Sequence, residues 1–156
     1  MSGGIREGEQ SKRERIEKWR LKIFAKHMVF NWRLVMNKKR RREIMSTINM
    51  AEKIQKEFED VQGPVNKEQK DQLMSKLNKL LKIVSDILSD EEYSFYNMPD
   101  GLQESDNGIV SQEAQENLGE AVNSLYEAIT LLNDGLVNDD TIDAIIDAII
   151  YMEDSV

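Results

Sequence analysis

Side chains that can neutralise phosphates and stack on bases are concentrated near the start of the chain. Lys38 to Arg42 are five consecutive cations, and the stretch before them interleaves Lys and Arg with Phe and Trp. Cations beside aromatic rings are typical of surfaces that bind nucleic acids. The candidate residues of this basic-aromatic segment are Trp19, Lys22, Lys26, Trp32, Arg33, Lys38, Lys39, Arg40, Arg41 and Arg42.

The same segment has other interpretations. A basic amphipathic helix can lie on an anionic membrane or dock into the groove of a partner protein. Its rings can also pack on the protein's own core while its cations pair with acidic residues of the same chain. The sequence favours packing within the chain, then a protein partner, and then nucleic acid or a membrane.

Acidic side chains dominate the other end of the chain. Residues 83–156 contain 18 Asp and Glu and neither Lys nor Arg, whereas residues 1–56 contain 16 Lys and Arg against 6 Asp and Glu. Spaced carboxylates on helices can imitate a phosphate array and compete for the cationic groove of a nucleic-acid-binding protein. Plain solubility is the commoner reason for such charge. The candidate acidic surface consists of Asp139, Asp140, Asp143 and Asp147.

The sequence offers no catalytic or metal-binding pattern. His27 has no Asp, Glu, Ser or Cys at helical spacing, and the chain contains no cysteine,. The acidic run 100–108 lacks the alternating oxygen ligands and the terminal glutamate of an EF-hand loop. The glycines of the chain do not form a phosphate-binding loop. We therefore expect a protein that is not an enzyme and that uses neither a metal nor a cofactor.

Length and hydropathy predict a protein of the cytoplasm. With 156 residues, 40% of them hydrophobic, the chain is long enough to bury a core,. Its most apolar window, residues 21–35, contains three Lys or Arg residues and one histidine. This window is too short and too charged to span a bilayer. The first fifteen residues are polar and do not resemble a secretory signal,. A membrane-bound protein is therefore not expected.

Apolar residues recur at intervals of three and four over most of the chain, which predicts helices. The expected helices span about 37–62, 67–96 and 111–133, followed by an isoleucine-rich acidic helix after Gly135. The predicted N-terminal caps are Asn66 with Gln69, Ser111, and Asn138 or Asp139,. The predicted C-terminal cap is Gly135,.

The breaks between helices are predicted from Gly63-Pro64 and from the segment 97–105,. We expect the second break to be a loop in which Asn97 or Ser105 bonds free backbone groups. Around it, four apolar or aromatic side chains are predicted to wrap the end of the bundle. They are Tyr93, Tyr96, Met98 and Leu102.

A heptad pattern predicts how the helices pack. Apolar residues alternate steps of four and three along the second helix, at Leu73, Leu77, Leu80, Val84 and Ile87,. The fold class is therefore all-α, either a helical bundle or an extended helical hairpin with coiled-coil-like packing. The expected organisation is a basic-aromatic extension over 1–35, a helical core over 36–134 and an acidic C-terminal helix over 135–156.

A recognisable pattern occupies four stretches of the chain, residues 36–44, 90–105, 114–118 and 121–129. These stretches resemble a group of small helical proteins encoded by phages and other mobile elements of Firmicutes. The shared pattern is a helix with an acidic-aromatic end, an Asn-x-Pro-x-x-Leu-Gln-x-Ser loop and a second helix. The resemblance covers about residues 36–134. It implies a mobile-element origin but no chemistry, because the group has no assigned activity.

The resulting functional hypothesis is a non-enzymatic, phage- or mobile-element-encoded protein that binds a protein in the host cytoplasm. Its leading form is an inhibitor of a nucleic-acid-handling or defence protein, of the anti-CRISPR type. One alternative is a nucleic-acid-binding accessory protein that uses the basic segment 12–42. The other is a structural helical homo-oligomer built on the heptad.

Overall fold

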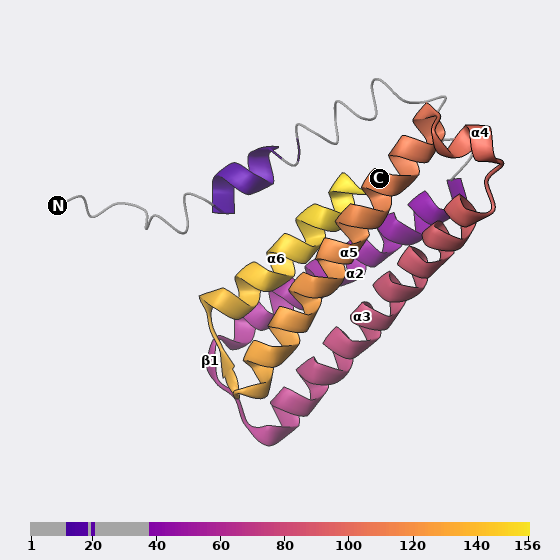
Figure 1. Cartoon of the computed structure of the whole chain (residues 1–156). Helices are drawn as coiled ribbons and strands as arrows, with labels where there is room; N and C mark the ends of the chain where they lie inside the picture. The colour runs from indigo at the N-terminus through magenta and orange to yellow at the C-terminus, as the bar shows by residue number, and fades with distance from the viewer. Residues whose placement is uncertain (1–11, 19, 21–37) are drawn as a thin grey trace.

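The computed structural model describes residues 12–18, 20 and 38–156 of the chain. Over this part the protein is all-α, as predicted, and Figure 1 shows long helices lying side by side. The long helices are α2 (Lys38–Val61), α3 (Lys67–Tyr96), α5 (Asp106–Asn133) and α6 (Asp139–Asp154). The short elements are α4 (Asp100–Gln103), β1 (Gly63–Pro64) and β2 (Leu136–Val137). Residues 12–18 form a further short helical segment, here called the arm.

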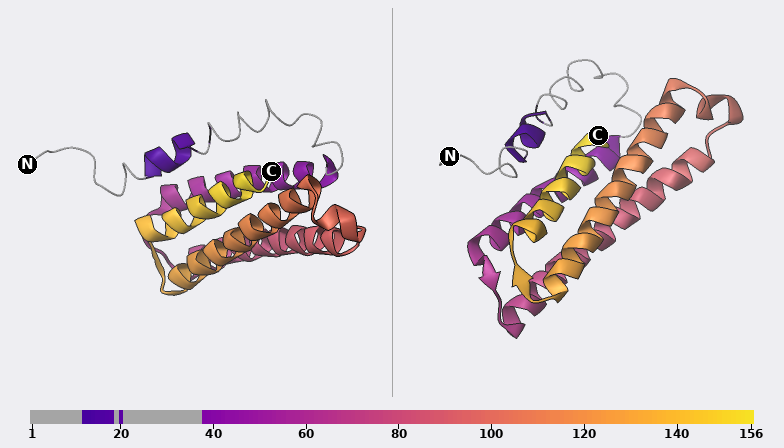
Figure 2. Two further views of the ribbon diagram at one scale, coloured as in Figure 1. Left: turned by 45° about the horizontal axis from the view of Figure 1, so that its top comes forward. Right: turned by 60° about the vertical axis from the view of Figure 1, so that its left-hand side comes forward.

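The long helices run alternately up and down around one core. Helix α2 packs against α3 and α6, and α5 packs against the same two helices, so the four form a closed ring. Figure 2 shows this arrangement from two further sides. The predicted helical bundle is therefore confirmed, as an up-and-down four-helix bundle. None of the described helices is apolar over a length that would cross a membrane.

One end of the bundle is closed by a very short antiparallel strand pair. Gly63 pairs with Val137, and Pro64 pairs with Leu136. The backbone N–H of Val65 also donates to the carbonyl of Gly135 at 3.3 Å. The pair joins the turn after α2 to the turn before α6, which fixes the relative heights of these helices. Residue patterns with a period of two did not reveal it, because each strand has only two residues.

The predicted heptad forms the core. Leu77, Leu80 and Val84 of α3 are completely buried, and Leu125 of α5 faces the same interior. Burying one such side chain contributes about 1.5–3 kcal/mol. The heptad therefore packs within a single chain. Helix α6 is buried over nine of its sixteen residues, because α2, α5 and the bundle interior surround most of its circumference.

Three of the predicted caps are confirmed. Asn66 Oδ1 accepts from the Gln69 N–H at 2.8 Å, and Gln69 Oε1 accepts from the Asn66 N–H at 3.2 Å, so both halves of a capping box are present,. Asn138 Oδ1 caps α6 by accepting from the Thr141 N–H at 3.1 Å. Gly135 follows α5 with a φ of 83°, the left-handed conformation that glycine adopts without strain,.

The predicted start of the third helix was wrong. Helix α5 begins at Asp106 with Ser105 at its N-cap, whereas Ser111 lies inside the helix and is buried. Gly108, which precedes the predicted helix start at Ser111, sits in the first turn of α5. A Cβ atom at Gly108 would lie 1.9 Å from the carbonyl oxygen of Gln103, so glycine permits the close approach of α4 to α5. Glycine usually indicates a loop, whereas here it allows the backbones of α4 and α5 to lie in contact.

The predicted wrap of four apolar or aromatic side chains around the bundle end was wrong for three of them, whereas Met98 is partly buried. Tyr93 is 73% exposed and Tyr96 is 82% exposed, and Leu102 is exposed as well. Both tyrosines lie on the side of α3 opposite the heptad, so they point to solvent. The predicted backbone bonds are present, since Asn97 Nδ2 donates to the Tyr93 carbonyl at 2.8 Å and Ser105 Oγ donates to the Leu102 carbonyl.

Candidate functional site

A row of carboxylates runs along the solvent face of α5. Its members recur at helical spacing, and all of them are exposed on the side opposite the buried Leu118 and Leu125. Neighbouring positions three or four residues apart on a helix lie about 5–6 Å from one another. The helix therefore holds negative charges at regular intervals on a rigid element. The row, here called the α5 acidic row, consists of Glu113, Glu116, Glu120 and Glu127.

The acidic residues predicted on α6 fall into two groups. Asp139 and Asp140 are exposed in the first turn, where a negative charge interacts favourably with the helix dipole,. Asp143 and Asp147 are only partly exposed, because the arm lies against them. The predicted surface of four aspartates is therefore covered along one half.

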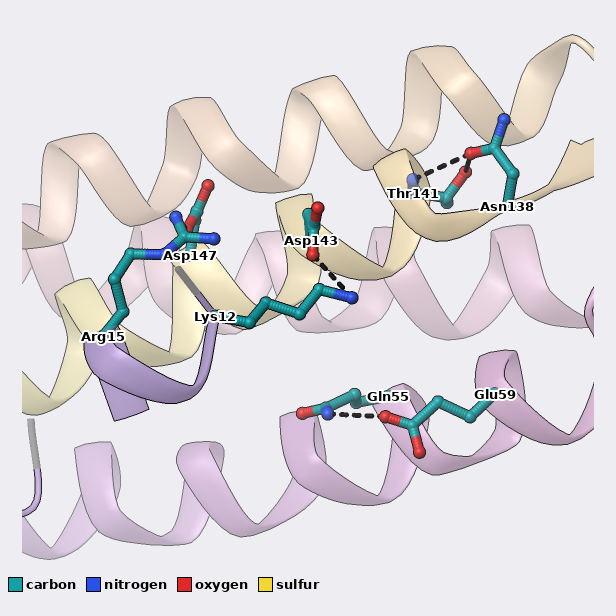
Figure 3. A network of polar contacts seen from close by, with 8 residues as sticks. All are labelled: Lys12, Arg15, Gln55, Glu59, Asn138, Thr141, Asp143 and Asp147. Atoms are coloured by element: carbon teal, nitrogen blue, oxygen red, sulfur yellow. Dashed lines mark hydrogen bonds and ion pairs between the residues drawn. The ribbon is translucent and has the colours of Figure 1, made fainter. Parts of the chain in front are cut away.

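The arm contacts α6 through two ion pairs from one helical turn. Lys12 Nζ lies 2.8 Å from Asp143 Oδ1, and Arg15 Nη1 donates to Asp147 Oδ1. Figure 3 shows both cationic side chains extending from the arm toward the aspartates of α6. Ile16, the residue after Arg15, packs against the hydrophobic core. The contact combines charge pairing with apolar burial.

Burial raises the pKa of Asp147 above its ordinary value. The largest cause is removal of the carboxylate from water; Arg15 and Lys12 oppose it, and the neighbouring carboxylate of Glu127 reinforces it,. Glu127 is the member of the α5 acidic row that acts on the Asp147 carboxylate.

We expect the titration midpoint of Asp147 to lie above 3.8, its unperturbed value. The folded state then binds this proton more tightly than the unfolded state. The contribution of Asp147 to the free energy of unfolding therefore rises as pH falls from the raised pKa toward 3.8,. NMR titration of the Asp147 carboxyl carbon measures this, and Glu127→Gln should lower the midpoint. A midpoint below 3.8 would show that the two cations outweigh burial.

Only part of the predicted basic-aromatic segment can be placed. Trp19, Lys22, Lys26, Trp32 and Arg33 lie outside the described residues. The five consecutive cations form the first turns of α2. Lys38, Lys39 and Arg42 are exposed, whereas Arg40 and Arg41 are partly buried.

Arg40 belongs to a buried polar cluster that sequence analysis missed. Its guanidinium pairs with the carboxylate of Glu91, which is only 4% exposed, and its Nη1 donates to Ser94 Oγ at 2.7 Å. The other Glu91 oxygen, Oε1, accepts from Ser111 Oγ at 2.8 Å. The signal was present in the sequence, since the heptad continues from Ile87 by steps of four and three to Glu91 and Ser94.

The position of this polar cluster explains its composition. Asn117 of α5 donates to the carbonyl of Asp154 at the end of α6, at 3.2 Å. Ser111 lies six residues earlier on α5, about 9 Å further along the bundle. Among the described helices, α2, α3 and α5 surround this layer, and α6 does not reach it. The core positions of this layer hold polar residues whose side chains bond to one another. An apolar layer in the same place would be uncovered on the side that α6 does not reach.

Acidic side chains are numerous among the described residues, but they do not gather into a metal site. There, no group of three or more His, Asp or Glu side chains lies close enough together to hold a metal ion. The fold and the charged surface define an acidic four-helix bundle with a basic arm on α6. Comparisons with protein-family models, with curated proteins and with solved structures give no match. The resemblance to helical mobile-element proteins stays a prediction.

Proposed function

We propose that this protein is a non-enzymatic inhibitor that binds a nucleic-acid-handling or defence protein of a host cell, as anti-CRISPR proteins do. In this proposal a phage or another mobile element encodes it, and it acts in the host cytoplasm. The observation that carries the proposal is the α5 acidic row, which is exposed within a 74-residue stretch that contains neither Lys nor Arg.

Charge and rigidity together support this function. A cationic groove that binds nucleic acid attracts any surface with a dense negative field, and attraction over a distance raises the association rate. Helix α5 is held by α3 and α6, so its carboxylates are presented without ordering a flexible segment on binding,. No cation from Ile83 onward repels the groove.

Neutralising the α5 acidic row is expected to weaken inhibition at least tenfold. The experiment uses purified nucleases and Cas effectors of a Firmicutes host and measures cleavage of a labelled DNA with increasing amounts of the protein. The test variant carries Glu113→Gln, Glu116→Gln, Glu120→Gln and Glu127→Gln. The matched control removes four exposed carboxylates elsewhere, with Glu52→Gln, Asp60→Asn, Glu68→Gln and Asp71→Asn.

The control separates a local effect from a change in net charge, because both variants lose four negative charges. Inhibition lost equally in the two variants would contradict a role for the α5 acidic row. A panel in which no enzyme is bound or inhibited by the natural chain would contradict the proposed function itself.

A nucleic-acid-binding accessory protein is the second candidate, favoured by the exposure of Lys38, Lys39 and Arg42 at the start of α2. Direct binding to DNA would weaken steeply as salt is raised, because phosphate contacts release counterions. A mobility shift of duplex DNA by the protein alone, abolished when these three cations are replaced by glutamine, would favour this candidate over the inhibitor.

A further inference from the structure

We propose that the arm is an autoinhibitory latch, which occupies the outward face of α6 in place of a cationic helix of the partner. This inference rests on the proposed function and adds a regulated, partly closed state to it. Its basis is that residues 12–18 already place a basic helix on the acidic surface, through Lys12, Arg15 and Ile16.

The spacing of the contacting residues indicates which kind of partner segment could compete with the arm. Lys12 and Arg15 are three residues apart on the arm, and Asp143 and Asp147 are four apart on α6, so each pair lies on one face of its helix,. Ile16 adds an aliphatic side chain at the edge of the core. A competing segment of the partner would therefore be a helix with two cations one turn apart, followed by an aliphatic residue.

The latch is suited to opening. The side chains of both ion pairs are between 20% and 38% exposed, so salt screens them in part,. Closure is nevertheless favoured, because the arm belongs to the same chain and has an effective concentration that can reach the millimolar range. A partner with more cations than the arm can displace it. If the latch were closed for nine-tenths of the time, it would weaken partner binding about tenfold.

A distance measurement tests the latch without any partner. The chain has no cysteine, so spin labels at Glu17→Cys on the arm and Thr130→Cys on α5 report one defined pair. We expect a narrow distance distribution at low salt. It should broaden when Lys12→Glu and Arg15→Glu are introduced, because each ion pair becomes a repulsion.

Two controls make the measurement specific. Lys18→Glu with Arg20→Glu causes the same change in charge at two exposed positions, one at the end of the arm and one just after it, and should leave the distribution narrow. Adding Asp143→Lys and Asp147→Lys to the Lys12→Glu, Arg15→Glu variant should restore it, since both pairs are re-formed with reversed charge. Equal broadening in the two arm variants, or no restoration, would overturn the latch.

A peptide added in trans then tests autoinhibition. A fluorescent synthetic peptide of residues 10–20 should bind the Lys12→Glu, Arg15→Glu protein several-fold more tightly than the natural chain, because the face of α6 is free. Equal binding would contradict autoinhibition even if the arm is docked. Neither experiment uses a host enzyme. If the protein bound no enzyme of the panel, the proposed function would be refuted, and the distance and peptide measurements would still decide whether the latch exists.

Discussion

Replacing Arg40 by alanine is expected to destabilise the bundle by about 3–5 kcal/mol. The reason is that Glu91 is only 4% exposed, and its charge would remain in the core without the guanidinium. Urea denaturation followed by circular dichroism measures the change in the free energy of unfolding. Arg42→Ala is the matched control, because Arg42 is exposed two residues away on the same helix. It should cost no more than about 0.5 kcal/mol.

A double replacement separates the interaction of Arg40 with Glu91 from the cost of leaving one charge buried alone. Arg40→Met together with Glu91→Met removes both charges and fills similar volume, and such replacements of buried pairs are often neutral or stabilising. We expect the double variant to recover most of the stability lost in Arg40→Ala. If Arg40→Ala cost as little as Arg42→Ala, the interaction between Arg40 and Glu91 would contribute nothing beyond an exposed ion pair.

Replacing Gly108 by alanine is expected to have the second large effect. The new Cβ would lie 1.9 Å from the Gln103 carbonyl oxygen and 2.7 Å from that of Leu102, and both are backbone atoms that cannot rotate away. Helix α4 would have to shift, at a cost of about 1–3 kcal/mol, the usual range for overpacking. Hydrogen exchange of the amides from Asp100 to Asp106 should increase at the same time.

Gly119 is the control on the same helix. A Cβ at Gly119 meets nothing within 4 Å, so Gly119→Ala should stabilise the protein by about 0.5–1 kcal/mol through the helix preference of alanine,. Opposite signs for the two glycines are thus expected. A stabilising Gly108→Ala would show that α4 and α5 are not in the close contact described.

Features that depend on neighbouring residues were predictable from the sequence. The heptad from Leu73 to Ile87 identified the buried side of α3, because apolar spacing alone decides which side of a helix faces a core,. The Asn66 capping box and the left-handed Gly135 were also predicted, since both depend on a few adjacent residues.

Features that depend on distant residues were not predictable in the same way. Ser105 and Ser111 are equally good caps by residue type, and in the structure Ser111 lies inside α5 and bonds to Glu91 of α3. The charge split predicted that the basic end could fold onto the acidic end. It could not give the register, because Lys12 and Asp143 belong to opposite ends of the sequence.

Displacement of nucleic acid is the most direct test of the proposed inhibition. A host nuclease or Cas effector that the protein inhibits is loaded with fluorescent duplex DNA, and the anisotropy is followed as the protein is added. We predict competitive displacement by the natural chain, stronger displacement by the Lys12→Glu, Arg15→Glu variant, and at least tenfold weaker displacement when the α5 acidic row is neutralised. Binding of the protein to the enzyme with the DNA still in place would contradict the claim that its acidic surface takes the place of nucleic acid.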